Sequence, residues 1–241
     1  MPQQPYQVFK IQQEWVLEPE ALGSKEKFWY QENDKGSEWL FKYPQENTGQ
    51  HWAEKIAAEV AASLGILHAR VELAAFGDSH GSATESFTRR GRSLFHGNQI
   101  LAGRVLGYDP DKAFRQSDHT LTNIFAAIDS AFVTQWSARK AKMLFAGYLV
   151  FDALIGNTDR HHENWGVLIK QVGNQWAGIL APTFDHASSL GRELGDSADG
   201  PCRERFLREK RVGAYSEKAH GGIFWDNSDR RGTSPLELAR R

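Results

Sequence analysis

An acidic and an amide side chain separated by four residues form the pattern with the most chemical content in this sequence. Asp159 and Asn164 stand directly after an apolar run, in Asn157-Thr158-Asp159-Arg160-His161-His162-Glu163-Asn164. In phosphoryl-transfer enzymes this D-x-x-x-x-N spacing lets the aspartate accept the proton of an attacking hydroxyl while the asparagine holds a magnesium ion. Asp185 follows a hairpin-like segment and ends another apolar stretch, as expected of a second magnesium ligand. The pattern therefore predicts Asp159 as the base and Asn164 and Asp185 as metal ligands.

Phosphate chemistry also needs a cation, and Lys42 is the best candidate because it lies in an aromatic strand-like segment. Glu54, on the helix predicted to follow, has alanines around it and would approach the sheet closely enough to hold that lysine; Glu59 is the competing choice. Upstream, Gly23 and Ser24 precede the first aromatic segment, where backbone N–H groups would cover nucleotide phosphates.

Each of these residues also has a purely structural interpretation. A strand lysine with a helix glutamate is often a solvated pair, and Asp159 and Asn164 are residue types that cap turns and occupy left-handed loop positions. A zinc site is a third interpretation, built on His161, His162, Glu163 and His186. No H-x-x-x-H or C-x-x-C spacing supports it.

Two regions with different apolar patterns, one typical of strands and one typical of helices, must position these residues. Lys27–Tyr30 and Trp39–Tyr43 predict a hairpin, a helix with Trp52, Ile56, Val60 and Leu64 on one side follows, and Val71–Phe76 and Thr84–Phe87 predict further strands. From about Leu121 the apolar spacing becomes helical, with Met143, Tyr148, Phe151 and Ile155 in one such run. We therefore expect an α+β chain with a small β-rich lobe, about 1–95, and a larger, mainly helical lobe, about 96–241.

Composition excludes some classes of function. The 241 residues suit a single two-lobed domain, and 29 Lys and Arg against 30 Asp and Glu give no electrostatic case for binding nucleic acid or a membrane surface. The single cysteine, Cys202, and a start without a basic, apolar leader favour a cytoplasmic protein.

The order of these residues resembles that of a known family. Ile155-Gly156-Asn157-Thr158-Asp159-Arg160-His161-His162-Glu163-Asn164, followed by Leu180-Ala181-Pro182-Thr183-Phe184-Asp185, is similar to the C-terminal kinase region of HipA-like proteins. Leu40-Phe41-Lys42 resembles that family's nucleotide-lysine strand, and Ala53-Glu54-Lys55-Ile56-Ala57 resembles its glutamate helix. The resemblance extends from about Gly23 to at least Leu190.

This resemblance implies a protein-kinase-like fold and a serine/threonine kinase that uses ATP and Mg²⁺. Asp159 would be catalytic, Asn164 and Asp185 would bind metal, and Gly23, Ser24, Lys42 and Glu54 would bind the nucleotide. Several HipA-like proteins are toxins of toxin–antitoxin modules that phosphorylate aminoacyl-tRNA synthetases, so such a substrate and an antitoxin partner are implied.

The chain also departs from the pattern of its relatives. Since the first expected nucleotide strand starts near residue 27, we expect a compact, HipT-like form without the additional N-terminal subdomain of full-length HipA. The glycine of the D-F-G motif is replaced, since His186 and Ala187 follow Asp185. Two other functions stay open on the residues alone: a kinase of a small molecule or lipid head group, and a nucleotide-binding interaction module without catalysis.

Overall fold

The computed structural model describes residues 5–19, 26–34, 36–88, 91–112, 115–194, 203–209 and 211–241. The chain divides into two compact units, one formed by Met1–Phe87 with His186–Arg208 and the other by Thr88–Asp185 with Glu209–Arg241. These units differ from the expected lobes, 1–95 and 96–241, chiefly because His186–Arg208 groups with the first unit. No described helix is long and apolar enough to cross a membrane.

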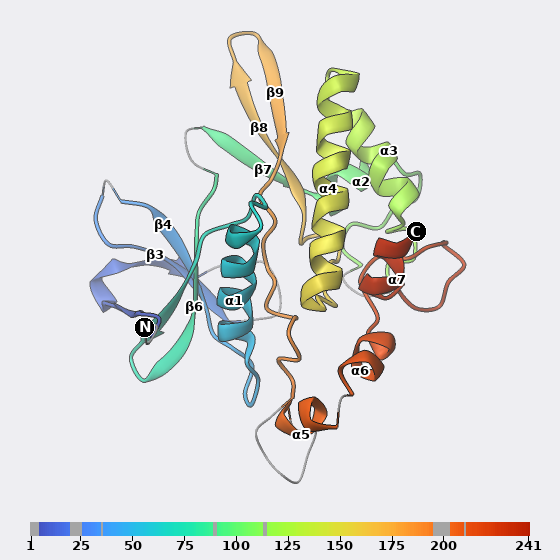
Figure 1. Ribbon diagram of the computed structural model, residues 1–241. Helices are drawn as coiled ribbons and strands as arrows, with labels where there is room; N and C mark the ends of the chain where they lie inside the picture. Colours follow the sequence, from blue (N-terminus) through green and yellow to red (C-terminus); the bar gives the residue numbers. More distant parts are fainter. Residues whose placement is uncertain are drawn as a thin grey trace. The chain divides into compact units, whose positions relative to one another are not determined.

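The first unit is built on a six-stranded sheet with strand order β1-β5-β6-β4-β3-β2 (Figure 1). The strands are β1 (Val8–Ile11), β2 (Val16–Pro19), β3 (Lys27–Gln31), β4 (Glu38–Lys42), β5 (Val71–Phe76) and β6 (Ser79–Glu85), and the helical segments are η1 (Gln13–Trp15), α1 (Gln50–Ser63) and α5 (Arg203–Arg208). The predicted hairpin is present as β3 and β4, which pair antiparallel with Lys27 opposite Lys42. Phe28, Tyr30 and Phe41 pack into its core.

Helix α1 packs on β5 and β6 through its alanine-rich side, the side that was expected to bring Glu54 close to the sheet. Ala53, Ala57 and Ala61 are fully buried, whereas Ile56 is 40% and Leu64 is 55% exposed. Of the four large apolar residues that recur along the helix, Ile56 and Leu64 therefore lie on its outer side. Small alanines let the helix axis lie close to the sheet, and this carries position 54 toward the strands.

The second unit combines a three-stranded sheet, in the order β7-β8-β9, with most of the helices (Figure 1). Its elements are β7 (Arg92–His96), α2 (Gly97–Ala102), α3 (Leu121–Ala131), α4 (Gln135–Ile155), β8 (Gly166–Val172), β9 (Gln175–Leu180), α6 (Val212–Lys218) and α7 (Pro235–Arg240). Strand β7 and helix α2 were not predicted. The β8–β9 hairpin separates the Asp159–Asn164 loop from Asp185, as expected.

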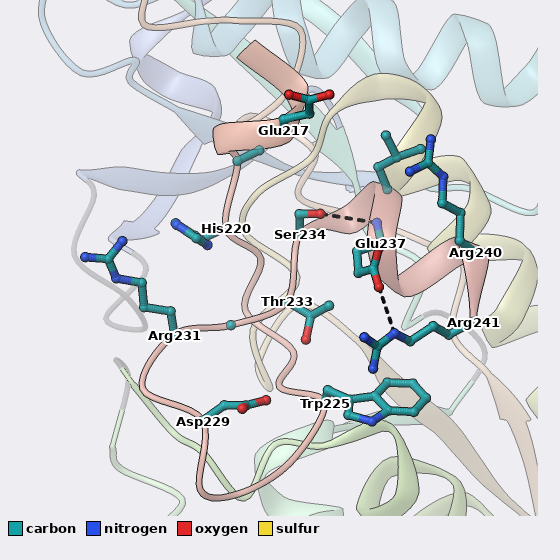
Figure 2. Close-up of a pocket in the computed structure, with 13 residues that line it drawn as sticks. Glu217, His220, Trp225, Asp229, Arg231, Thr233, Ser234, Glu237, Arg240 and Arg241 are labelled. Atoms are coloured by element: carbon teal, nitrogen blue, oxygen red, sulfur yellow. Dashed lines mark hydrogen bonds and ion pairs between the residues drawn. The ribbon is translucent and has the colours of Figure 1, made fainter. Parts of the chain in front are cut away.

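Helix α4 packs against α3 and α7. Phe145, Tyr148, Phe151 and Ile155 are buried, but Met143, expected on the same face, is 68% exposed. Helix α7 is capped by Ser234, whose hydroxyl accepts a hydrogen bond from the Glu237 backbone N–H at 3.2 Å (Figure 2). Such a cap satisfies one of the free N–H groups of the first turn and holds the C-terminal segment against α4.

Candidate active site

The loop that carries Asp159 and Asn164 begins where α4 ends. Gly156 adopts φ 65°, the left-handed conformation that terminates helices, and its N–H donates to the carbonyl of Asp152. Asn157 then donates its backbone N–H to the same carbonyl at 2.9 Å and its side-chain amide to the Asp152 carboxylate at 2.8 Å. The helix end therefore fixes the start of the loop.

Asn164 is oriented by a hydrogen bond within the loop. Its amide nitrogen donates to the backbone carbonyl of Asp159 at 2.6 Å, and its backbone N–H donates to His161 O at 3.0 Å. Because the amide nitrogen makes this hydrogen bond, the amide oxygen is the atom that could serve as a ligand for a hard cation. The Asp159 carboxylate is 42% exposed and lies 3.9 Å from His161 Nε2.

Arg160 connects this loop to helix α4 and to the segment that leads to Asp185. The guanidinium group donates from Nε and Nη2 to the two oxygens of Asp152, each at 2.8 Å, and from Nη2 to the Thr183 hydroxyl at 2.8 Å. Nη1 donates to the carbonyl of Asn164 at 2.5 Å and to that of Phe184 at 3.3 Å. One buried side chain thus joins the backbones next to both candidate metal ligands.

The charge of Arg160 is secured by its surroundings. Burial alone would lower the pKa of the guanidinium group, but the charge and hydrogen bonds of Asp152, with a contribution from Asp185, raise it. The Arg160 and Asp152 side chains are 4% and 3% exposed. A bidentate, fully hydrogen-bonded pair is the geometry in which buried charges are tolerated.

Asp185 has a backbone conformation that is rare for its residue type. Its φ is 56°, in the left-handed region that non-glycine residues enter at some energetic cost. Such outliers are concentrated at functional sites, where the surrounding structure holds them in place. The sequence suggested that a strand ends on Asp185. In the structure β9 ends five positions earlier, at Leu180.

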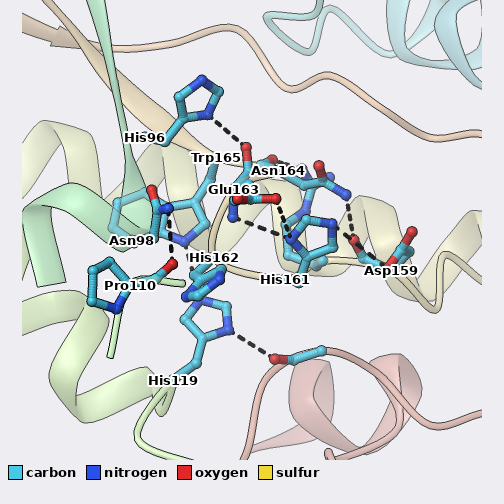
Figure 3. Close-up of polar contacts among 12 residues, drawn as sticks. His96, Asn98, Pro110, His119, Asp159, His161, His162, Glu163, Asn164 and Trp165 are labelled. Atoms are coloured by element: carbon cyan, nitrogen blue, oxygen red, sulfur yellow. Dashed lines mark hydrogen bonds and ion pairs between the residues drawn. The ribbon is translucent and has the colours of Figure 1, made fainter. Parts of the chain in front are cut away.

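Two buried histidines, His119 and the loop residue His162, lie close to each other at the Asp159–Asn164 loop (Figure 3). His119 Nδ1 lies 2.8 Å from Gly222 O, and Nε2 accepts from the indole N–H of Trp165 at 3.1 Å, so Nδ1 carries the proton. Burial lowers the pKa of His119 to about 3, and burial also lowers the pKa of His162, which hydrogen-bonds Tyr108 at 2.7 Å. Both rings are neutral structural groups at pH 7.

Lys42 and Glu54 meet within the first unit. Lys42 Nζ lies 3.6 Å from Glu54 Oε1, an ion-pair distance slightly beyond hydrogen-bond range, and the Ser82 hydroxyl donates to Glu54 Oε2 at 3.4 Å. Glu54 is fully buried and Lys42 is 9% exposed. The competing residue, Glu59, instead pairs with Lys55 at 2.6 Å. Gly23 and Ser24 lie outside the described residues.

Asp159 lines a cavity of about 250 Å³ within the second unit. A larger cavity of about 550 Å³ lies among residues 217–241 and is not lined by Asp159 (Figure 2). The smaller cavity is therefore the one next to the candidate base.

Sequence reasoning missed Arg160, Asp152, Thr183 and His119, but it expected His162 to organise the loop by hydrogen bonding. Asp152 gave a usable signal, since a lone carboxylate within the apolar run of a helix requires a buried partner.

Comparison with known proteins defines the class of the molecule. The structure is similar to the crystal structure of the Helicobacter pylori proinflammatory kinase CtkA, with a TM-score of 0.68 and 22% identity over 86% of this chain and 69% of that chain. Shewanella oneidensis HipA, solved with HipB and operator DNA, gives a TM-score of 0.50 and 18% identity over 70% of this chain and 43% of that one. The α+β, protein-kinase-like fold predicted from the sequence is therefore confirmed.

The family follows from the sequence. The pattern of the HipA-like C-terminal domain matches residues 20–220, and the chain belongs to that family. Serine/threonine-protein kinase CtkA of Helicobacter pylori is 27% identical over 144 residues, which make up 60% of this chain and 42% of that protein. The match thus spans less than half the length of this relative.

Proposed function

We propose that this chain is a serine/threonine protein kinase that transfers the γ-phosphoryl group of ATP to a protein hydroxyl. The observation that carries the proposal is the hydrogen bonding of Arg160 to the carbonyls of Asn164 and Phe184, which ties the two candidate metal-binding segments together beside Asp159. The name of the CtkA relative supports the same reaction class.

The donor set fits a magnesium ion, a hard cation that prefers oxygen ligands. Asn164 would contribute its amide oxygen and Asp185 its carboxylate. When bound, the metal would neutralise charge on the β- and γ-phosphates. Lys42, held by Glu54, would neutralise further phosphate charge, and Gly23 and Ser24 would add backbone donors.

Asp159 would accept the proton of the acceptor hydroxyl and orient that hydroxyl toward the phosphorus atom. The rigid backbone around it matters because phosphoryl transfer depends on positioning and charge stabilisation more than on a strong nucleophile. His161, His162 and His186 would organise the loop rather than act as bases.

The comparisons support a finer version of the proposal. The similar Shewanella HipA structure contains HipB, and on that basis we extend the proposal to a toxin with an antitoxin partner. An aminoacyl-tRNA synthetase is the substrate that the family resemblance suggests, and acting on it would require a cytoplasmic location.

The test separates binding from chemistry. Asp159→Ala should bind ATP as the wild type does, because this side chain would contact the acceptor hydroxyl and not the phosphates. Phosphorylation of a lysate protein should fall by at least ~100- to 10,000-fold, because general-base assistance and hydroxyl positioning are both removed. Asp185→Ala should lose magnesium-dependent ATP binding and transfer together. ATP titration and labelling with radioactive ATP on the same folded preparations measure both quantities. Full transfer by Asp159→Ala would show that this acid is not catalytic.

A further inference from the structure

The cavity beside Asp159 is built from three segments of the second unit. Thr158, Asp159, His161 and His162 come from the catalytic loop, Arg115 to His119 form a second wall, and the segment from His220 to Gly232 forms a third. Neither Asn164 nor Asp185 is among the described residues that line it. The cavity therefore lies beside the candidate base without including the candidate metal ligands.

The third wall is anchored to the catalytic loop. A side-chain carbon at Gly222 would come within 2.8 Å of backbone atoms of Arg160 and His161, so the two backbones are in close contact. Gly221 N–H donates to Thr233 O at 2.9 Å, and Thr233 N–H donates to Ile223 O at 2.7 Å. These bonds close a loop that carries Arg230 and Arg231 at a fixed place beside Asp159.

Positive charge dominates the lining. Arg115, Arg230 and Arg231 line the cavity, and across the described ranges none of these guanidinium groups has an ion-pair partner. Asp159 is the single carboxylate among the described lining residues. Figure 2 shows Arg231 and His220 on the segment that forms this wall.

A buried donor also lines the cavity without a partner. His162 is 1% exposed, and its Nε2 has no hydrogen-bond partner among the described residues. Its Nδ1 lies 2.7 Å from the Tyr108 hydroxyl. In the tautomer in which Nδ1 accepts from this hydroxyl, Nε2 carries the hydrogen. A buried N–H without a partner costs free energy that an oxygen ligand would recover.

We propose that this cavity binds an anionic side chain of the acceptor protein, so that acidic residues next to the target hydroxyl select the substrate. The inference rests on the proposed kinase function and adds the chemical class of the substrate segment. Arginine guanidinium groups bind carboxylates and phosphates through paired N–H donors. The anion is an aspartate or glutamate of the substrate, or a phosphoserine already present there.

A binding assay tests the cavity independently of catalysis. Fluorescently labelled peptides with one central serine, flanked by aspartates, asparagines, lysines or a phosphoserine, are titrated with the full chain. Wild type should bind the aspartate peptide about tenfold more tightly than the asparagine peptide, since several partly exposed charge pairs form together. The double variant Arg230→Ala, Arg231→Ala should lose that difference, and the matched control Arg139→Ala, an exposed arginine outside the cavity, should keep it.

Charge reversal adds a stricter condition. Arg230→Glu with Arg231→Glu should shift preference toward the lysine peptide, and circular dichroism verifies that the variants are folded. Equal wild-type affinity for the aspartate, asparagine and phosphoserine peptides would overturn the proposal. Preference for the aspartate peptide that survives both double variants would also overturn it. A phosphoserine peptide that binds more tightly than the aspartate peptide would assign the site to phosphate; otherwise it is assigned to carboxylate.

Failure of the inference is distinguishable from failure of the proposed function. A chain that phosphorylates neutral and acidic serine peptides with equal KM is a kinase without this anion subsite. A chain that binds acidic peptides through Arg230 and Arg231 but transfers no phosphate to any peptide or lysate protein has the subsite without the proposed kinase activity.

Discussion

Arg160 is the residue on which the geometry of the Asp159–Asn164 loop depends most. Its guanidinium group donates to both carboxylate oxygens of the buried Asp152. It also donates to the backbone carbonyl of Asn164 and to that of Phe184, the residue before Asp185. A guanidinium group is suited to this because its donors lie in one plane with a fixed fork. Lysine would supply a charge but not the same set of directions.

Arg160→Ala should lower the free energy of unfolding by ~3–5 kcal/mol, because it leaves the Asp152 carboxylate buried without its cation. Metal-dependent ATP binding should weaken in any fraction that folds, since the Asn164 and Asp185 segments lose their common anchor. Urea denaturation with a parallel ATP titration measures both effects.

The matched control is Arg208→Ala. Arg208 makes an exposed pair with Glu204 at 2.7 Å, four residues apart on α5, and the loss of such a pair costs only ~0.3–0.5 kcal/mol. If the two variants lose equal stability, Arg160 is not the anchor that its contacts indicate.

The sequence pointed to the candidate site residues but not to the residues that hold them in place. Asp159 and Asn164 are recognisable because they stand five positions apart, in a pattern that is known from phosphoryl-transfer enzymes. Arg160 stands between them and was passed over, because its partners Asp152 and Thr183 lie 8 residues before and 23 residues after it. The contact between His119 and Gly222 spans 103 residues and leaves no local pattern at all.

At the scale of elements, the start of α2 is where the β7-β8-β9 sheet meets the Asp159–Asn164 loop. Gly97 follows β7 directly, and its N–H donates to Trp165 O at 2.8 Å. A side-chain carbon there would come within 2.2 Å of the Trp165 ring and 2.6 Å of the His162 carbonyl. The carbonyl belongs to the loop backbone, so it cannot move without shifting the loop.

Gly97→Ala should therefore destabilise the protein by ~1–3 kcal/mol, as overpacking of a tight contact does, and should lower phosphate transfer by displacing the loop. Gly147→Ala is its control: Gly147 lies within α4 with no atom near its added carbon, and alanine there should stabilise by up to ~1 kcal/mol. Thermal unfolding and transfer rates of both variants would be compared. A Gly97→Ala variant as stable and active as Gly147→Ala would contradict this contact.

The types of the main elements were predictable, but helix faces and short elements were not. Periodicity located α1, α3 and α4, and aromatic alternation located the β3–β4 hairpin. The alanine-lined side of α1, which carries Glu54, was expected to approach the sheet, but Met143, expected in the same apolar run as Tyr148 and Phe151, is exposed. Strand β7 was missed because its sequence, Arg-Ser-Leu-Phe-His, has only two apolar residues.

At the scale of the whole molecule, the HipA-like C-terminal domain pattern covers residues 20–220, and the remaining C-terminal residues 221–241 are part of the second unit. They provide Gly222, whose carbonyl accepts the His119 hydrogen bond, and two of the three arginines of the cavity, Arg230 and Arg231. The segment beyond the family match thus contributes to the architecture around the candidate base.

Stability should fall in mild acid because of the buried histidines. Burial, together with the neighbouring His162, His161 and Arg160, holds the pKa of His119 at about 3, against about 6.5 in the unfolded chain. Above pH 6.5 neither state binds the proton. Between pH 6.5 and pH 3 the unfolded state takes it up and the folded state does not, so the free energy of unfolding decreases as pH falls.

From pH 7.5 to pH 5.0 the contribution of His119 to this loss should be ~2 kcal/mol, since each pH unit below 6.5 is worth about 1.4 kcal/mol. His119→Gln keeps a donor for Gly222 O and an acceptor for the Trp165 indole but does not titrate. For each protein, urea denaturation at both pH values gives the loss of unfolding free energy between pH 7.5 and pH 5.0. This loss should be ~2 kcal/mol smaller in the variant than in the wild type. His162, whose pKa is also lowered by burial, is present in both proteins and does not affect the comparison. Equal acid sensitivity would mean that His119 is protonated in the folded state and does not have the neutral form that its two hydrogen bonds require.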